Sequence, residues 1–233
     1  MYPMGIGFGL DPTMLILIPA LLLSMWAQSR VSSTFAQYSK VRARGGVTAD
    51  QVARMLLTRF GLGSMPINQV SGELTDNYNP SNRTLNLSES VYNNPSIASI
   101  GVAAHEVGHA IQHSQLYAPL MFRNSIVPVV SIASSASMPL FMIGLVVGNS
   151  MLLNLGIILF TGSIIFHLVT LPVELDASSR ALKLLEQTGT LTSDELAGAR
   201  KVLNAAALTY VAAALMSILQ LVRLIMIKNS RER

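Results

Sequence analysis

Three of the four histidines of the chain lie in the stretch AAHEVGHAIQH, residues 103–113. On a helix, residues four apart are separated by about 6 Å on one face, so His105 and His109 can direct two imidazole nitrogens at one metal ion. Glu106 projects beside that ion, where a general base acting on a metal-activated water is needed. Gly108 leaves the helix surface open to close approach by another helix. The pattern therefore predicts a zinc site with an adjacent catalytic carboxylate.

The alternative is a structural role, because lone histidines in apolar helices are more often hydrogen-bonded core residues than ligands. Metal binding is favoured for His105 and His109, since His, Glu and His occur together at this spacing. His113 differs, because it lies about 12 Å from His105 along a helix that rises about 1.5 Å per residue. One ion cannot reach both, so we expect His113 to support the ligands from outside or to be structural.

A catalytic zinc generally takes three protein ligands and leaves one position for water. The chain has no cysteine, so the third ligand must be His167 or a carboxylate further along the chain. Glu174 is the leading candidate, because it follows an apolar segment where an unpaired charge is costly. His167 lies on nearly the same helix face, but Pro172 and its depth in the apolar segment make it the weaker ligand. It can instead donate a hydrogen bond near the site, or be a satisfied intramembrane histidine.

Asp176 has two interpretations of equal weight. It stands two residues after Glu174 and so points away from that side chain on a helix. It either forms an ion pair with Arg180, one turn later, or accepts the N–H of a liganding imidazole. The first role is structural, and the second orients a metal ligand.

The composition indicates a membrane protein. Hydrophobic residues make up 51% of the 233 residues and charged residues only 12%, whereas a typical soluble domain has about 25% charged residues. The net charge of +4 does not indicate nucleic acid, because the basic residues are scattered and mostly flank apolar segments. We therefore expect a lipid bilayer as a partner, and no nucleic acid.

Four apolar segments are candidates for crossing a bilayer, which takes about 20 helical residues. No basic residue precedes the first segment and Arg30 follows it, so we interpret it as an uncleaved anchor and not as a signal peptide. The second and third segments are separated only by Gly148-Asn149-Ser150, which predicts an antiparallel transmembrane hairpin. The four predicted spans are 10–28, 126–147, 151–172 and 205–227.

The polar remainder is predicted to form a small catalytic region within a single domain, 1–233. Residues 29–125 include a helix at about 48–60, a short hairpin or edge strand after the turn at 79–82, and the histidine helix at 96–114. Residues 173–204 carry the third ligand and a further helix start. The expected fold class is mainly α, a polytopic membrane protein with about four transmembrane helices and a small α(+β) catalytic region.

The distribution of Lys and Arg predicts the orientation of the spans. Eight lie between the first and second spans and four in 173–204, whereas none precedes the first span or lies in the 148–150 turn. By the positive-inside rule, both polar regions and the active site face the cytoplasm, with the spans in the inner (plasma) membrane. Four further basic residues, at the end of the last span and after it, disagree. Either that helix does not fully cross the membrane or the rule fails at this end.

An N-terminal anchor is followed by NYNPSNRTLNLSE, VAAHEVGHAIQH and LPVELDASSRAL, in that order. This order resembles the YugP-like family of bacterial membrane zinc metallopeptidases over almost the whole chain. It is similar, more distantly, to gluzincin membrane proteases that include the heat-shock membrane protease and the prenyl-protein endopeptidase. The resemblance implies a zincin-like catalytic region with one zinc ion per chain, His105, His109 and Glu174 as its ligands, and Glu106 as catalytic base.

The same resemblance implies an edge strand on which an extended peptide substrate pairs. Its residues would be Asn82, Arg83, Thr84, Leu85, Asn86 and Leu87. The relatives usually show a Glu-x-x-x-Asp arrangement, whereas here Asp176 stands two residues after Glu174 and Ser178 stands four after it. An oxyanion-stabilising residue is also expected, and Tyr210, Arg180 and His167 compete for that role.

The sequence therefore predicts an integral membrane zinc endopeptidase that hydrolyses membrane or membrane-adjacent polypeptides. A metal transporter is a rival, but it would need ionisable groups near the middle of several spans, and the second predicted span has none. A scaffold that retains zinc without catalysis is the other rival. The intact Glu106 argues against it.

Overall fold

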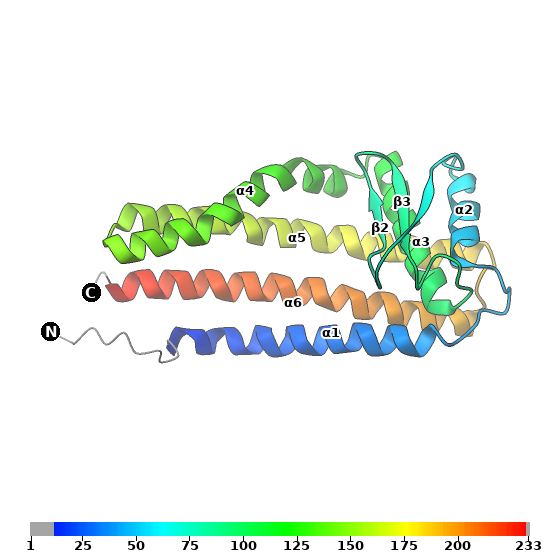
Figure 1. Ribbon diagram of the computed structural model, residues 1–233, viewed down its shortest axis with the longest axis horizontal. Coiled ribbons are helices and arrows are strands. Elements are labelled where there is room, and N and C mark those ends of the chain that lie inside the picture. The colour runs from blue at the N-terminus through cyan, green and yellow to red at the C-terminus, as the bar shows by residue number, and fades with distance from the viewer. Residues whose placement is uncertain (1–11, 232–233) are drawn as a thin grey trace.

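Four long helical segments run along the molecule, and a small α/β region lies at one end of them (Figure 1). The structure is a computed structural model and describes residues 12–231. The long segments are η1 (Pro12–Leu17) leading into α1 (Ile18–Tyr38), α4 (Ala118–Val147), α5 (Ser150–Gln187) and α6 (Ser193–Arg231). All four are long and apolar enough to cross a membrane. The predicted mainly α, polytopic fold is confirmed; residues 10 and 11 of the first predicted span lie outside the described residues.

The helices α5 and α6 are longer than the spans predicted within them. Pro172 does not end α5, so the third span and the segment that carries Glu174 form one 38-residue helix. Proline is tolerated inside membrane helices, where neighbouring groups satisfy the backbone that it leaves unpaired. The 39 residues of α6 would span about 58 Å, against about 30 Å of hydrocarbon in a bilayer. Both helices can therefore cross a membrane and continue into the α/β region.

The predicted hairpin between the second and third spans is present. Gly148 takes a left-handed conformation with φ 74°, which glycine adopts without steric cost, and ends α4. The Asn149 side chain then accepts hydrogen bonds from the backbone N–H groups of Met151 and Leu152, at 2.9 and 3.2 Å, and caps α5. Along the hairpin, a Cβ on Gly156 would lie 2.8 Å from the carbonyl oxygen of Ser137, so the two helices touch there through backbone.

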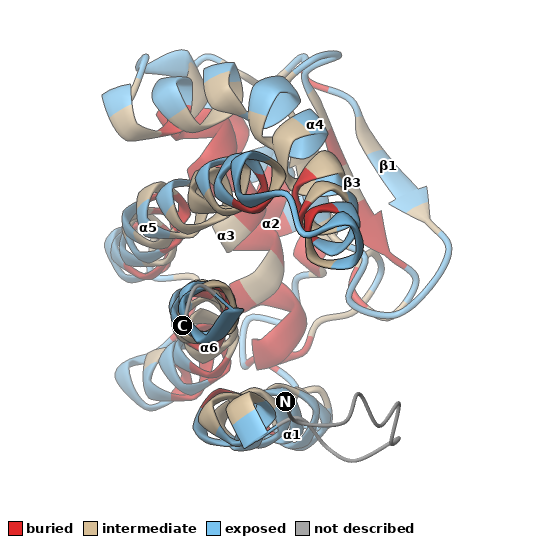
Figure 2. Ribbon diagram, turned by 90° about the vertical axis from the view of Figure 1, so that its left-hand side faces the viewer, coloured by how far each residue is buried: buried red, intermediate tan, exposed pale blue. Residues whose placement is uncertain are grey.

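The α/β region is built on α3 (Ile97–Ser114), which packs against α2 (Ala49–Arg59), the sheet and the adjacent parts of α5 and α6. Buried residues concentrate in this region (Figure 2). Ser96 caps α3, because its side chain accepts a hydrogen bond from the backbone N–H of Ser99 at 3.2 Å. Both helices predicted in this region are therefore confirmed.

The sheet has three strands in the order β1-β3-β2: β1 (Ile67–Val70), β2 (Asn77–Asn79) and β3 (Thr84–Ser88). β2 and β3 form the predicted hairpin, with Tyr78 opposite Leu85, and β1 pairs with β3 in parallel. The prediction that residues 82–87 form an edge strand is wrong, because β3 is paired on both sides. Asn82 and Arg83 belong to the turn before it. The strand at the edge facing α3 is β2.

Candidate metal centre

His105 and His109 of α3 and Glu174 of α5 form a cluster of possible metal ligands. The two Nε2 atoms are 3.2 Å apart, and they lie 3.3 and 3.4 Å from Oε2 of Glu174. His109 is 9% exposed and Glu174 5% exposed, so water does not solvate the cluster fully. Within residues 12–231, this is the one group of three His or carboxylate side chains close enough to share an ion.

The shape of this cluster fits a zinc ion. Tetrahedral zinc binds His nitrogen and carboxylate oxygen at about 2.0 to 2.2 Å, which places two ligand atoms about 3.3 to 3.6 Å apart. The three observed separations of 3.2, 3.3 and 3.4 Å match one face of such a tetrahedron. The donor set, two imidazoles and a carboxylate, is also one that catalytic zinc uses.

Close contact between α3 and α5 brings the ligands together. Gly108 lies against the backbone of Ala177, and a Cβ at Gly108 would be 2.7 Å from the Ala177 carbonyl oxygen. The expectation that Gly108 opens the helix surface to another helix is confirmed. Gly101 faces Ala199 of α6 in a similar way, at 3.4 Å from its Cβ. Small residues therefore seat the histidine helix on both long helices.

A chain of hydrogen bonds orients His109. Its Nδ1 lies 3.0 Å from Oε1 of Gln112, whose amide nitrogen donates to the carbonyl oxygen of Val173 and to Asp176. Because those two acceptors fix the amide nitrogen of Gln112, the amide oxygen faces His109 and accepts a hydrogen bond from its Nδ1–H. The Nε2 lone pair is then free for an ion. Asp176 also pairs with Arg180 at 2.5 Å, so it forms the expected ion pair and reaches the imidazole only through Gln112.

Different partners hold the other two ligands. The Nδ1 atom of His105 lies 3.0 Å from the Ser178 hydroxyl, so the serine four residues after Glu174 contacts a ligand. Arg123 of α4 donates to Oε1 of Glu174 at 3.1 Å, which leaves Oε2 to face the histidines. Each ligand therefore has a separate second partner, and the partners come from three helices.

Glu106 is 8% exposed and lies beside the cluster. The backbone N–H of Tyr78 in β2 donates to its Oε2 at 2.8 Å, so the edge strand holds this carboxylate in place. Asp76, just before β2, lies near Glu106, and its pKa is raised, mainly by burial and partly by the Glu106 charge. Two adjoining cavities of about 330 and 190 Å³ are both lined by Asp76, His105, Glu106, Glu174 and Tyr210.

The remaining predicted site residues lie at different distances from the cluster. Tyr210 lines both cavities at the cluster. Arg180 instead donates to Asp176 and Gln115. His113 lies outside the ligand cluster, with Nδ1 2.7 Å from the Tyr78 hydroxyl, and its pKa is lowered, mainly by burial. His167 lines a different cavity, between the long helices.

Sequence reasoning missed four contributors: Tyr78, Gln112, Arg123 and Ser178. Helix spacing carried a signal for two of them, because Gln112 is three residues after His109 and Ser178 four after Glu174. Tyr78 acts through its backbone N–H and Arg123 comes from another helix, so no local pattern marks either.

A model of the family described as "Putative neutral zinc metallopeptidase" matches residues 13–229. The chain belongs to this zinc metallopeptidase family. "Putative membrane protease YugP" of Bacillus subtilis (strain 168) is 50% identical to it over 210 residues, which cover 90% of this chain and 93% of that protein. No solved structure matches the chain. The resemblance to the YugP-like family is therefore confirmed.

The match to the zinc metallopeptidase family covers all the residues of the cluster. Residues 13–229 include His105, Glu106, His109 and Glu174, as well as most of the four long helices. Zinc as the expected ion and a protease-like activity follow from this membership at the level of the family.

Proposed function

We propose that the chain is a zinc-dependent membrane endopeptidase that cuts membrane or membrane-adjacent polypeptides. The observation that supports this most strongly is the triangle of His105, His109 and Glu174 donor atoms, 3.2 to 3.4 Å apart, with Glu106 beside it in an accessible cavity. A structural zinc site is normally closed by four protein ligands, whereas three ligands next to a cavity leave a position for water.

A zinc ion bound by these ligands would activate a water molecule and polarise the peptide carbonyl of the substrate. Glu106 takes the proton of the attacking water and returns it to the leaving amine. The Tyr78 N–H holds the Glu106 carboxylate in position for both transfers. Gln112, Ser178 and Arg123 keep the ligands oriented during the reaction.

Tyr210 is the group that we assign to the oxyanion. It lines both cavities at the cluster, whereas Arg180 is engaged by Asp176 and Gln115, and His167 lies in another cavity. A hydroxyl donor aimed at the developing negative charge stabilises the transition state of peptide hydrolysis. For the substrate strand we assign β2 as the facing edge, because Asn77 and Tyr78 line the smaller cavity.

The site is proposed to face the cytoplasm, in the inner (plasma) membrane. The Lys and Arg tally supports this orientation. The ligand cluster lies near the α/β end of helices that are long enough to cross the bilayer, so substrates would be segments at or near the membrane surface.

The test uses purified full-length protein and unfolded casein. Wild-type protein should produce internal casein fragments, should lose this activity when a chelator strips its metal, and should regain it when zinc is added back. Mass spectrometry of the fragments distinguishes internal cuts from trimming of the ends. Cleavage that survives metal removal would overturn the proposal.

The same preparation separates the two rival functions. A zinc-retaining scaffold would bind about one zinc per chain, the number expected for a single three-ligand site, and show no turnover. A transporter would move zinc into liposomes that contain the protein. The transporter is the less favoured rival, because α4 carries no ionisable residue after Arg123.

A further inference from the structure

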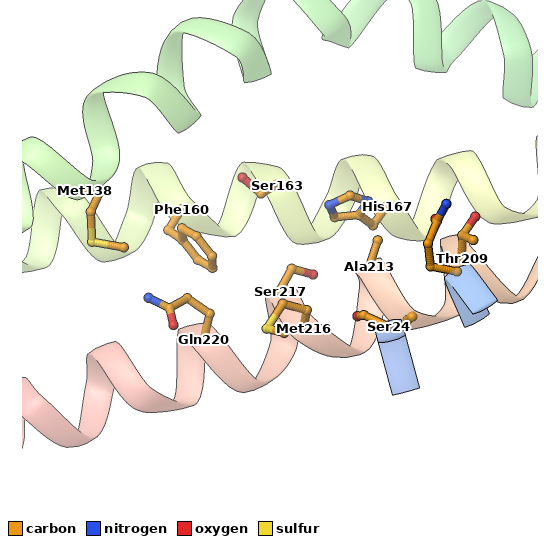
Figure 3. Close-up of a pocket in the computed structure, with 12 residues that line it drawn as sticks. Ser24, Met138, Phe160, Ser163, His167, Thr209, Ala213, Met216, Ser217 and Gln220 are labelled. Carbon is orange, nitrogen blue, oxygen red and sulfur yellow. The ribbon is translucent and has the colours of Figure 1, made fainter. Parts of the chain in front are cut away.

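A third cavity lies between the long helices, and none of the three possible metal ligands lines it. It measures about 560 Å³ and is lined by side chains of α1, α4, α5 and α6. Figure 3 shows Ser163 and His167 of α5 on one side of it and Ser217 and Gln220 of α6 on the other. Gln220 is ten residues beyond Tyr210, so the cavity extends about 15 Å along α6 from the active site.

Three polar side chains that line this cavity, Gln28, His167 and Gln220, lack hydrogen-bond partners within residues 12–231. The His167 ring packs edge-on against the neighbouring Phe166 ring. The hydroxyls differ: Ser217 donates to Ala214 of its own helix, and Thr209 to Ala206. An amide or imidazole inside a bilayer is costly without a partner. The cavity therefore calls for a polar ligand.

The cavity adjoins the active site. Gln28 of α1 and Thr209 of α6 line both it and the cavity of about 330 Å³ that contains His105, Glu106 and Glu174. Thr209 is also the residue before Tyr210. A molecule in the intramembrane cavity thus meets these two residues and then the catalytic carboxylate.

We propose that this cavity is a substrate channel that holds an extended, unwound stretch of a membrane-spanning polypeptide. An extended chain rises about 3.3 Å per residue, so a length of about 15 Å accommodates four or five residues. Unwound backbone exposes N–H and C=O groups that hydrocarbon cannot satisfy. Gln220 offers both donors and an acceptor, and His167 offers one of each. A lipid acyl chain has no group for these partners.

This inference rests on the proposed function and names its substrate class: membrane spans cut where they leave the bilayer. The channel would lower the cost of unwinding such a span and guide it to Glu106. Casein, which reaches the site from water, would not need the channel.

The test compares two substrates in lipid nanodiscs that contain the full-length protein: a single-span polypeptide and unfolded casein. Gln220→Leu removes the amide without changing the size of the side chain much, and Ala213→Phe fills the cavity. Val211→Phe is the matched control, because Val211 is on the same helix but 41% exposed on its outer surface. Both cavity variants should lose about tenfold in kcat/KM on the span and keep casein cleavage, while the control keeps both.

Retained casein cleavage also shows that a variant is folded. Equal losses on both substrates, or no loss on the span, would overturn the channel while leaving the proposed endopeptidase in place. Absence of casein cleavage in the wild type would instead overturn the proposed function.

A second arm does not depend on turnover, because the natural chain has no cysteine. Met216, which lines the cavity, is changed to cysteine in a Glu106→Gln background, with Val211→Cys as the lipid-facing control. Oxidation should cross-link Met216→Cys to cysteines placed a few residues inside the membrane from the cut site of the span. Equal cross-linking from both positions would mean that lipid, and not the span, occupies the cavity.

Discussion

Glu174 is the residue on which the choice of third ligand depends. Its Oε2 lies 3.3 and 3.4 Å from the two histidines, whereas His167 lies in a separate cavity. Loss of a side chain that only hydrogen-bonds to a ligand typically weakens metal binding by about 10- to 100-fold. Glu174→Ala removes a ligand itself, so it should weaken zinc binding by more than that. His167→Asn should keep zinc. Zinc content after dialysis against a graded chelator measures both, and the reverse order of losses would make His167 the ligand.

Gln112 is the residue at which the effect of a ligand's hydrogen-bond partner on zinc affinity can be measured. Gln112→Leu removes the oxygen that accepts a hydrogen bond from the Nδ1–H of His109, so zinc affinity should fall by about 10- to 100-fold without loss of the fold. Gln115→Leu is the matched control, because Gln115 contacts Arg180 and no ligand. Competition with a fluorescent zinc chelator gives both affinities. Equal affinities would mean that the Gln112 bond does not tune the site.

The sequence predicted most readily the site residues that are close to one another in the chain. His105, Glu106 and His109 share one helix, where spacing alone fixes their directions. Glu174 followed from the cost of a bare charge beside an apolar segment. Arg123 and Tyr78 could not be found in this way, because each reaches the site through packing between elements that lie far apart in the sequence.

Gly108 carries the contact between the helices that supply the ligands. Gly108→Ala would place a methyl group 2.7 Å from the Ala177 carbonyl, so α3 must move away from α5 and from Glu174. A displacement of this kind should reduce casein cleavage on the order of 100-fold. Gly162→Ala, on a face of α5 where the nearest atom is 3.9 Å away, should cleave normally. Similar rates for the two variants would show that the close approach is not needed.

The helices were predicted well, because the periodicity of their own sequences determines them. The sheet was predicted less well, because its order depends on which strands pair. The capped helices around residues 48–60 and 96–114 follow from their own sequences. The alternation in residues 83–87 indicated a strand with one exposed face, but it does not say how many strands pair with it. β1 pairs with the side of β3 that was predicted to be free, so β2 is an edge strand in its place.

The proposed orientation gives the whole molecule a direction across the bilayer. The 148–150 turn and the end of α6 lie at the opposite end from the α/β region (Figure 1). Arg223 of α6 donates to Thr13 of η1 at 3.2 Å, which places the C-terminal part of α6 beside η1. In the proposed orientation α6 is long enough to cross the bilayer, which would put its last basic residues outside and make this end an exception to the positive-inside rule.

Single cysteines test this orientation, because the natural chain has none. In intact spheroplasts, an impermeant maleimide should label Ser150→Cys at the hairpin turn. It should label Ser114→Cys, at the end of α3, only after the membrane is opened. Both positions are exposed, and the unmodified chain is the blank. The opposite labelling order would place the site outside the cell.

In the proposed mechanism, Glu106 performs the chemistry at a zinc ion held by His105, His109 and Glu174. The most direct measurement is the rate of casein cleavage by Glu106→Gln and wild type, with the zinc content of each determined in the same samples. Because glutamine keeps the shape of the side chain but cannot take a proton, we predict equal zinc content and a rate lower by about 10²- to 10⁴-fold. If the variant bound zinc and cleaved as fast as the wild type, Glu106 would not be the catalytic base.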